Sequence, residues 1–113
     1  MSVATLSVKS IDHVIDSTMQ AFSGKAQGNH ISFLSYELLW KVLAPNRLNI
    51  VKTLIASEPL ALREIARRVD RDVKAVHTDV KLLLNTGMLD KAENGKIVFR
   101  YDAIHVDFIL QPA

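Results

Sequence analysis

The sequence contains no cysteine, only four glycines and three prolines among its 113 residues. Without cysteine there can be no disulfide, thiolate metal site or cysteine nucleophile, and we expect a reducing compartment, the cytoplasm. No apolar run approaches the ~20 residues that a membrane-spanning helix needs, and residues 1–10 lack the apolar core of a secretory signal, so no membrane partner is expected. Because 49% of the residues are hydrophobic, the chain should form a packed core rather than remain disordered.

Residue patterns that would indicate catalysis or metal binding are also missing. The four histidines lie too far apart for a metal site made of neighbouring residues, so no metal or other cofactor is expected. Near the C-terminus, alternation places His105 and Asp107 on one face of a strand, and Asp102 precedes them. This pattern indicates a strand surface rather than an acid-base cluster. With no nucleophile elbow and no glycine-rich phosphate loop, we expect a protein that is not an enzyme.

Positive charge is concentrated in one part of the chain. Residues 45–100 hold eleven Lys and Arg against seven Asp and Glu, whereas residues 1–44 are balanced and residues 101–113 carry two acidic residues. A local excess of basic side chains favours a polyanionic partner, although chance also produces an excess of four charges on a protein surface.

Hydrophobic periodicity divides the chain into two regions. In the first, residues 5–9 and 30–34 read as strands and residues 11–22 as a helix, which makes a β-α-β extension over residues 1–34. In the second, helices are predicted at residues 36–43, 45–56, 62–69 and 73–86. We expect Trp40 to pack in the core, with an interface anchor as the alternative.

Residues 62–86 read as two helices joined by a tight turn. Asp70-Arg71 forms the turn, Asp72 caps the second helix, and Gly87 stands where a left-handed residue ends it. Along that second helix, apolar residues recur at helical spacing, namely Val73, Val76, Val80, Leu83 and Leu84. A different face carries polar and basic residues at i, i+3, i+4 and i+7, namely Lys74, His77, Thr78 and Lys81.

A helix that is anchored on one side can present its other side to the DNA major groove. The row of Lys74, His77, Thr78 and Lys81 is therefore a candidate DNA-reading surface, and the solvated face of an ordinary amphipathic helix is the alternative. Arg67, Arg68 and Arg71 precede the row and are candidates for contacts with the DNA backbone. Asn46 and Arg47 open the helix at residues 45–56 and are further phosphate candidates.

A hairpin follows these helices. Residues 88–91 and 96–100 flank Glu93-Asn94-Gly95, and Asn-Gly favours a tight hairpin turn because both residues accept positive φ. The residues near this turn are either wing contacts to phosphate or the minor groove, or parts of an ordinary turn: Lys91, Asn94, Gly95, Lys96 and Arg100. A last strand is predicted at residues 104–110, with Ile104, Val106, Phe108 and Leu110 on one face.

The order of helices, hairpin and strand predicts an α+β fold: a winged helix-turn-helix DNA-binding domain at residues 35–113 after the N-terminal β-α-β extension. Four segments carry a resemblance to a known family: Pro45-Asn46-Arg47, residues 62–68, residues 71–80 and residues 101–107. Over about residues 35–110 the chain resembles the small MarR-like winged-helix transcriptional regulators of bacteria and archaea. That resemblance implies DNA binding and dimers. In antitoxin-like members encoded beside a toxin-like protein, it also implies autoregulation of the operon.

We therefore expect a sequence-specific regulator that binds double-stranded DNA as a homodimer, in which the N-terminal extension is a candidate for dimerisation. A recognition helix at about residues 72–86 would enter the major groove, and a wing at about residues 88–101 would contact the flank. The alternative is an antitoxin or protein-interaction module that neutralises a neighbour-encoded, toxin-like partner, with or without autoregulatory DNA binding.

Overall fold

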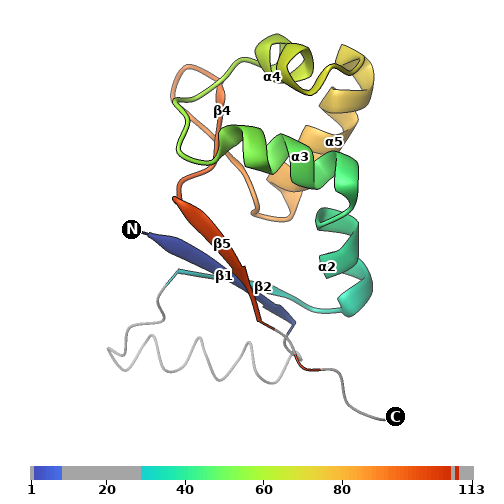
Figure 1. Ribbon diagram of the computed structural model, residues 1–113, viewed down its shortest axis with the longest axis vertical. Coiled ribbons are helices and arrows are strands. Elements are labelled where there is room, and N and C mark those ends of the chain that lie inside the picture. The colour runs from blue at the N-terminus through green and yellow to red at the C-terminus, as the bar shows by residue number, and fades with distance from the viewer. Residues whose placement is uncertain (1, 9–28, 108, 110–113) are drawn as a thin grey trace.

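The computed structural model describes residues 2–8, 29–107 and 109, and within them the chain forms a small mixed α/β domain with four helices (Figure 1). Its elements in chain order are β1 (Val3–Val8), β2 (His30–Phe33), α2 (Tyr36–Val42), α3 (Pro45–Leu54), α4 (Leu62–Val69), α5 (Val73–Asn85), β3 (Asp90–Lys91), β4 (Ile97–Val98) and β5 (Ala103–Val106). The helix predicted at residues 11–22 lies outside the described residues, as do residues 108 and 110 of the predicted last strand.

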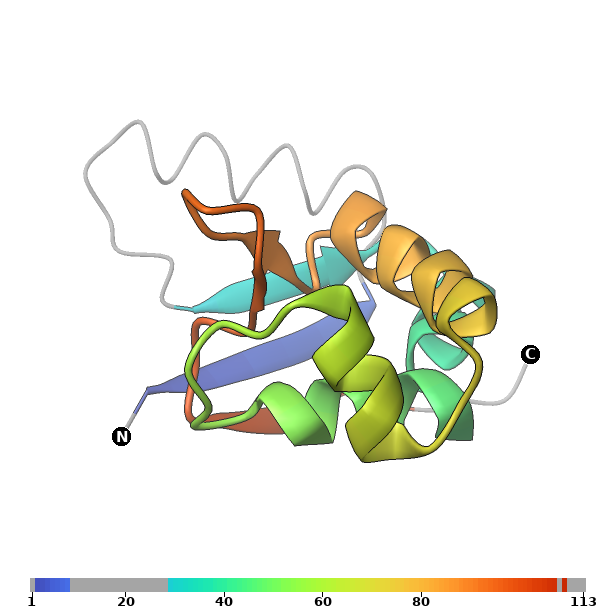
Figure 2. The ribbon, with the colours of Figure 1, turned by 90° about the horizontal axis from the view of Figure 1, so that it is seen from above.

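A three-stranded parallel sheet with the order β2-β1-β5 forms one end of the molecule. In its register, Leu6 of β1 lies between Ile31 of β2 and Val106 of β5. Figure 2 looks down through the helices and the hairpin onto β1 and β2. The sheet therefore combines strands from the N-terminal extension with a strand that the sequence placed in the C-terminal domain.

The buried apolar side chains form one continuous core that reaches from the sheet to the helices. Ala4, Leu6 and Phe33 contribute from the sheet, each with no more than 1% of its surface exposed. The helices and the hairpin contribute Leu39, Val42, Ile50, Val51, Leu54, Ile65, Ala66, Val76, Val80, Leu83 and Ile97. Because β1 and β2 supply part of this core, they support the position of the helices above them.

The predicted caps are confirmed, whereas α2, α3 and α5 end at residues 42, 54 and 85, one or two residues before the predicted ends. Ser35 caps α2 by accepting a hydrogen bond from the Leu38 N–H, and the Asp72 carboxylate caps α5 by accepting one from the Lys74 N–H at 3.0 Å. Asp70 has a left-handed backbone with φ 55°, and Gly87 has φ 82°. Asp tolerates this conformation because its short polar side chain can bond locally, so the turn between α4 and α5 forms without glycine.

The hairpin differs from the prediction in its turn. Within the turn of the hairpin, Gly95 has a positive φ of 80° and Asn94 does not, so the expectation of positive φ at both residues is wrong. Its loop closes through the Ala92 N–H to the Lys96 carbonyl at 2.8 Å and the Gly95 N–H to the Ala92 carbonyl at 2.9 Å. This is the pattern of a three-residue loop, in which one left-handed residue follows an ordinary turn. The Asn94 side chain instead accepts a hydrogen bond from the Lys96 N–H.

Trp40 does not pack in the core as expected, because 49% of its surface is exposed. On α2 the buried residues are Leu39 and Val42, three positions apart. One residue along a helix turns the side chain by about 100°, which carries Trp40 off the buried face. The apolar run in this part of the sequence concealed the true periodicity.

Candidate nucleic-acid interface

Helix α5 separates a buried face from an exposed face. Val76, Val80 and Leu83 are at most 2% exposed and anchor the helix in the core. The predicted basic and polar row is exposed at all four positions: Lys74, His77, Thr78 and Lys81. Lys74 and Val76 are two residues apart, which corresponds to about 200° around the helix and places them on opposite sides, whereas His77 lies beside the apolar row, about 60° from Val80. Val73 at the first turn is 39% exposed and is not part of the anchor.

The basic side chains of the exposed row are not neutralised by ion pairs within the described residues. Within the part of the chain that the structure describes, Lys74, His77 and Lys81 take part in no ion pair. The Thr78 hydroxyl donates to the Lys74 carbonyl one turn earlier, at 3.2 Å. This face can therefore offer two ammonium groups and an imidazole to an anion, while both lone pairs of the Thr78 hydroxyl remain acceptors.

Asp79 lies on the buried face of α5, with 8% of its surface exposed. One carboxylate oxygen accepts from Arg47 Nη1 at 3.1 Å, and the other accepts from Arg71 Nη1 at 2.8 Å. Arg47 belongs to α3, and Arg71 to the turn before α5. The pair of salt bridges therefore fastens the first turn of α3 and the turn before α5 to the second turn of α5.

This network changes the role of two predicted DNA contacts. The side chains of Arg47 and Arg71 are 22% and 23% exposed and are directed to Asp79, which makes them supports of α5 rather than free cations. Sequence reasoning missed Asp79. The available signal was a carboxylate among the apolar positions 76, 80 and 83, because a buried acid needs a basic partner.

Arg67 and Arg68, the other predicted backbone contacts, both contact Glu64 on α4. Glu64 accepts from Arg67 one turn away and from Arg68 Nε at 3.0 Å. The hydrogen bonds from Arg67 and then Arg68 hold the pKa of Glu64 at about 2, below its ordinary value of 4.5. These pairs are at the surface, where an ion pair contributes little net stability, so a phosphate can compete for both guanidinium groups.

The Glu64 pairs predict a pH effect on thermal stability. A carboxyl whose pKa is lowered by folding stabilises the folded state above its unfolded pKa, and that contribution is lost as the pH falls toward the folded pKa. We expect the melting-temperature difference between wild type and Glu64→Gln to shrink as the pH falls from about 4.5 to about 2. Thermal melts monitored by circular dichroism would measure it.

Glu58→Gln is the matched control, because Glu58 is exposed and makes no ion pair within the described residues. The difference between wild type and Glu58→Gln should not follow that pattern. A Glu64→Gln difference that stays constant across this pH range would contradict the assignment of these pairs.

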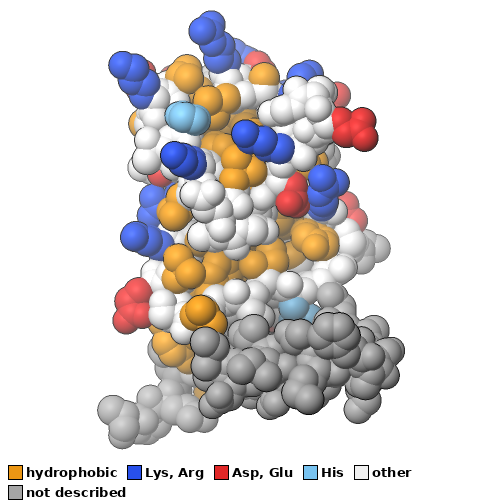
Figure 3. All heavy atoms as spheres, turned by 180° about the vertical axis from the view of Figure 1, so that it is seen from behind, with side chains coloured by type: hydrophobic (Ala, Val, Ile, Leu, Met, Phe, Trp, Pro, Cys, Tyr) orange, Lys and Arg blue, Asp and Glu red, His pale blue; other side chains and the backbone are white. Residues whose placement is uncertain are grey.

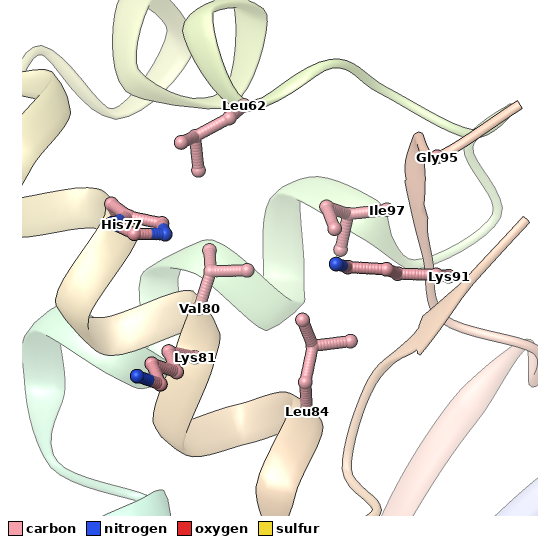
Figure 4. A pocket seen from close by; sticks show the side chains of 8 residues that line it. All are labelled: Leu62, His77, Val80, Lys81, Leu84, Lys91, Gly95 and Ile97. Carbon is pink, nitrogen blue, oxygen red and sulfur yellow. The ribbon is translucent and has the colours of Figure 1, made fainter.

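The β3–β4 hairpin lies beside the exposed face of α5. Lys91 and Lys96 are exposed, and Arg100 Nε contacts the Asp90 carboxylate at 3.2 Å. Seen from the side opposite to Figure 1, basic side chains surround an apolar strip in the upper half of the molecule (Figure 3). A hollow between α5 and the hairpin is bordered by His77 and Lys81 from α5 and by Lys91 and Gly95 from the hairpin (Figure 4).

The comparison with family models matches the family described as HVO_A0114 to residues 42–106, more than half of the chain. The chain belongs to the HVO_A0114 family. No curated protein and no solved structure matches it significantly. The HVO_A0114 match runs from the end of α2 to the end of β5, and thus contains α5, the Asp79 network and the hairpin.

Within the HVO_A0114 segment, the structure groups the predicted site residues into three sets. Lys74, His77, Thr78 and Lys81 share one face with the hairpin beside it, Arg67 and Arg68 are held by Glu64, and Arg47 and Arg71 are held by Asp79. Asn46 is exposed in the first turn of α3, where Ala44 provides no side-chain cap.

Two further observations concern other kinds of site. Asp102 accepts hydrogen bonds from the Ser2 backbone N–H and hydroxyl, which lower its pKa, and it thus joins β5 to β1. Among the described residues, no cluster of three potential metal ligands occurs. None of the described helices is long and apolar enough to cross a membrane.

Proposed function

We propose that the protein is a sequence-specific, DNA-binding transcriptional regulator of the winged-helix type that acts as a homodimer. In this proposal α5, with its cap at about residues 72–86, enters the major groove, and the segment at about residues 88–101 contacts the flanking backbone. The observation that carries the proposal is the exposed row Lys74, His77, Thr78 and Lys81 on a helix whose opposite face is locked in the core.

The arrangement around the hairpin supports a winged helix. Leu60, between α3 and α4, pairs with Ile97 of β4 through backbone hydrogen bonds of 2.8 and 2.9 Å. The hairpin is therefore attached to the connection that precedes the two helices of the turn motif. This attachment would hold the wing beside α5, where both could meet one DNA duplex.

The residues take different roles in the proposed complex. Lys74 and Lys81 bind phosphate or guanine, and His77 and Thr78 contact base edges. Lys91 and Lys96 contact the flanking phosphates. Arg67 and Arg68 exchange Glu64 for phosphate, whereas Arg47 and Arg71 position α5 through Asp79.

The test is binding of the full chain to duplexes measured by fluorescence anisotropy at several salt concentrations. One duplex contains the promoter of the protein's own gene, and a second contains the same bases in scrambled order. We expect the promoter to bind more tightly, by about a thousandfold or more as is typical of specific sites, and both affinities to fall with salt. Equal affinity for the two duplexes would contradict sequence-specific regulation.

A second candidate function, an antitoxin or other protein-interaction module, is favoured by apolar residues exposed at the sheet end. Leu34 is 61% and Ile109 70% exposed, and the Tyr36 hydroxyl donates to the Ile109 carbonyl at 2.9 Å, which brings the two segments together. Exposed apolar residues mark a protein contact where they form a contiguous patch, and the hydrogen bond between Tyr36 and Ile109 favours such a patch here.

Co-purification with the neighbour-encoded protein tests this candidate. If this surface holds the partner, Leu34→Asn together with Ile109→Asn should release it and leave DNA binding intact. Removing residues 1–34 would be a poor test, because it deletes Ala4, Leu6 and Phe33 from the core. Lys52→Ala, at an exposed position on α3, is the control.

A further inference from the structure

A hollow of about 200 Å³ lies between α5 and the β3–β4 hairpin. Its lining includes aliphatic side chains from three elements: Leu62 of α4, Val80 and Leu84 of α5, and Ile97 of β4. In Figure 4 these four side chains face a common space. Val80 and Ile97 belong to the buried core, so the floor of the hollow is a part of the core that is reached from outside.

The polar lining of this hollow is basic. His77 and Lys81 border it from α5, and Lys91 reaches into it from β3 with its ammonium group directed toward the aliphatic side chains (Figure 4). No acidic residue lines it among those that the structure describes. Neither lysine forms an ion pair within the described residues.

We propose that this hollow binds a small aliphatic carboxylate. An apolar cavity of about 150 Å³ holds one benzene molecule, so this volume accommodates a chain of roughly six to eight carbon atoms. Among the described residues, the apolar lining is aliphatic, with the His77 imidazole at the border, which suits a flexible alkyl body. The carboxylate group pairs with Lys91, whose ammonium group is directed into the hollow, and with Lys81, whose long side chain points outward in Figure 4 and turns to reach it. A neutral ligand of the same size would partly desolvate these ammonium groups without supplying an opposing charge.

The position of the hollow predicts a consequence for regulation, and this step rests on the proposed function. A carboxylate bound there neutralises Lys81 and occupies the space between the proposed recognition helix and the wing. DNA phosphates compete for the same cations. The bound carboxylate therefore acts as an effector that releases the protein from DNA.

Nuclear magnetic resonance titration of the full chain tests the site itself, with hexanoate, 1-hexanol and hexylammonium as probes of equal chain length and different charge. We expect saturable shifts from hexanoate at Leu62, Val80 and Leu84, and binding of 1-hexanol weaker by about fivefold. The Lys81→Gln/Lys91→Gln variant should bind hexanoate about tenfold more weakly. The Lys41→Gln/Lys52→Gln variant, with the same net charge, should bind it like wild type.

Three results would overturn the site: no saturable shift up to high millimolar hexanoate, shifts centred on other residues, or 1-hexanol bound as tightly as hexanoate. A second arm adds hexanoate to the protein–promoter complex, where displacement supports the effector role and an unchanged complex refutes it. If the chain binds hexanoate in the hollow but does not bind DNA, the proposed function fails and the carboxylate site stands.

Discussion

The Lys74→Ala/Lys81→Ala variant is expected to bind promoter DNA about tenfold to a hundredfold more weakly than wild type at physiological salt. Both side chains lie on the exposed face of α5 without an ion pair among the described residues. Each phosphate that a lysine neutralises releases counterions, which adds about 0.9 to the slope of log affinity against log salt. Losing two such contacts should reduce that slope by about 1.8, and anisotropy titrations would measure it.

The matched control is Lys41→Ala/Lys52→Ala, which has the same net charge but changes exposed positions on α2 and α3. It separates the loss of two contacts from the loss of general positive charge. If the control lowers the affinity and the slope as much as the α5 variant does, α5 is not the recognition helix. Unfolding of the α5 variant is not expected, because the helix is anchored by its opposite face.

Replacing Asp79 by Asn should lower the free energy of unfolding by about 2 kcal/mol and the melting temperature by about 10 °C. The substitution leaves the guanidinium groups of Arg47 and Arg71 beside each other without the carboxylate that they share. Removing one partner of a fully buried pair costs about 3–5 kcal/mol. We expect a smaller loss, of about 2 kcal/mol, because both arginines are about one-fifth exposed and regain some hydration when the carboxylate is removed.

Asp70→Asn is the control for the Asp79 variant. Asp70 is exposed, and Asn also adopts the left-handed backbone of this position. Chemical denaturation of both variants would compare the free energies, and we expect a change below about 0.5 kcal/mol for the control. Equal stability of the two variants would show that the Asp79 network does not hold α3 and α5 together.

Local chemistry in the sequence predicted the helix caps well, and the helix ends to within two residues. Ser35 and Asp72 cap helices through hydrogen bonds to backbone N–H groups two or three residues away. Gly87 follows α5 in a left-handed backbone conformation that glycine adopts without strain. The exposed row on α5 follows equally from local periodicity. The turn of the hairpin was less predictable, because Asn-Gly is compatible with both a two-residue and a three-residue loop.

Contacts between distant segments account for what the sequence did not reveal. The exposure of Trp40 depends on which face of α2 meets the core, and a short helix with apolar residues on several sides leaves that choice to its neighbours. The pairing of β5 with β1 joins residues about a hundred positions apart. It has no local signature beyond the strand pattern itself.

The sequence by itself determined the helices, their caps and the exposed basic face of α5, because those depend on interactions within one or two helical turns. Only the tertiary structure decided which of the basic residues are free. Packing of α3 against α5 brings Arg47 to Asp79 across 32 positions of the chain, and a buried carboxylate holds its arginines because unpaired charge is costly there. Pairing of Leu60 with Ile97 likewise holds the hairpin beside α5, with the hollow between them.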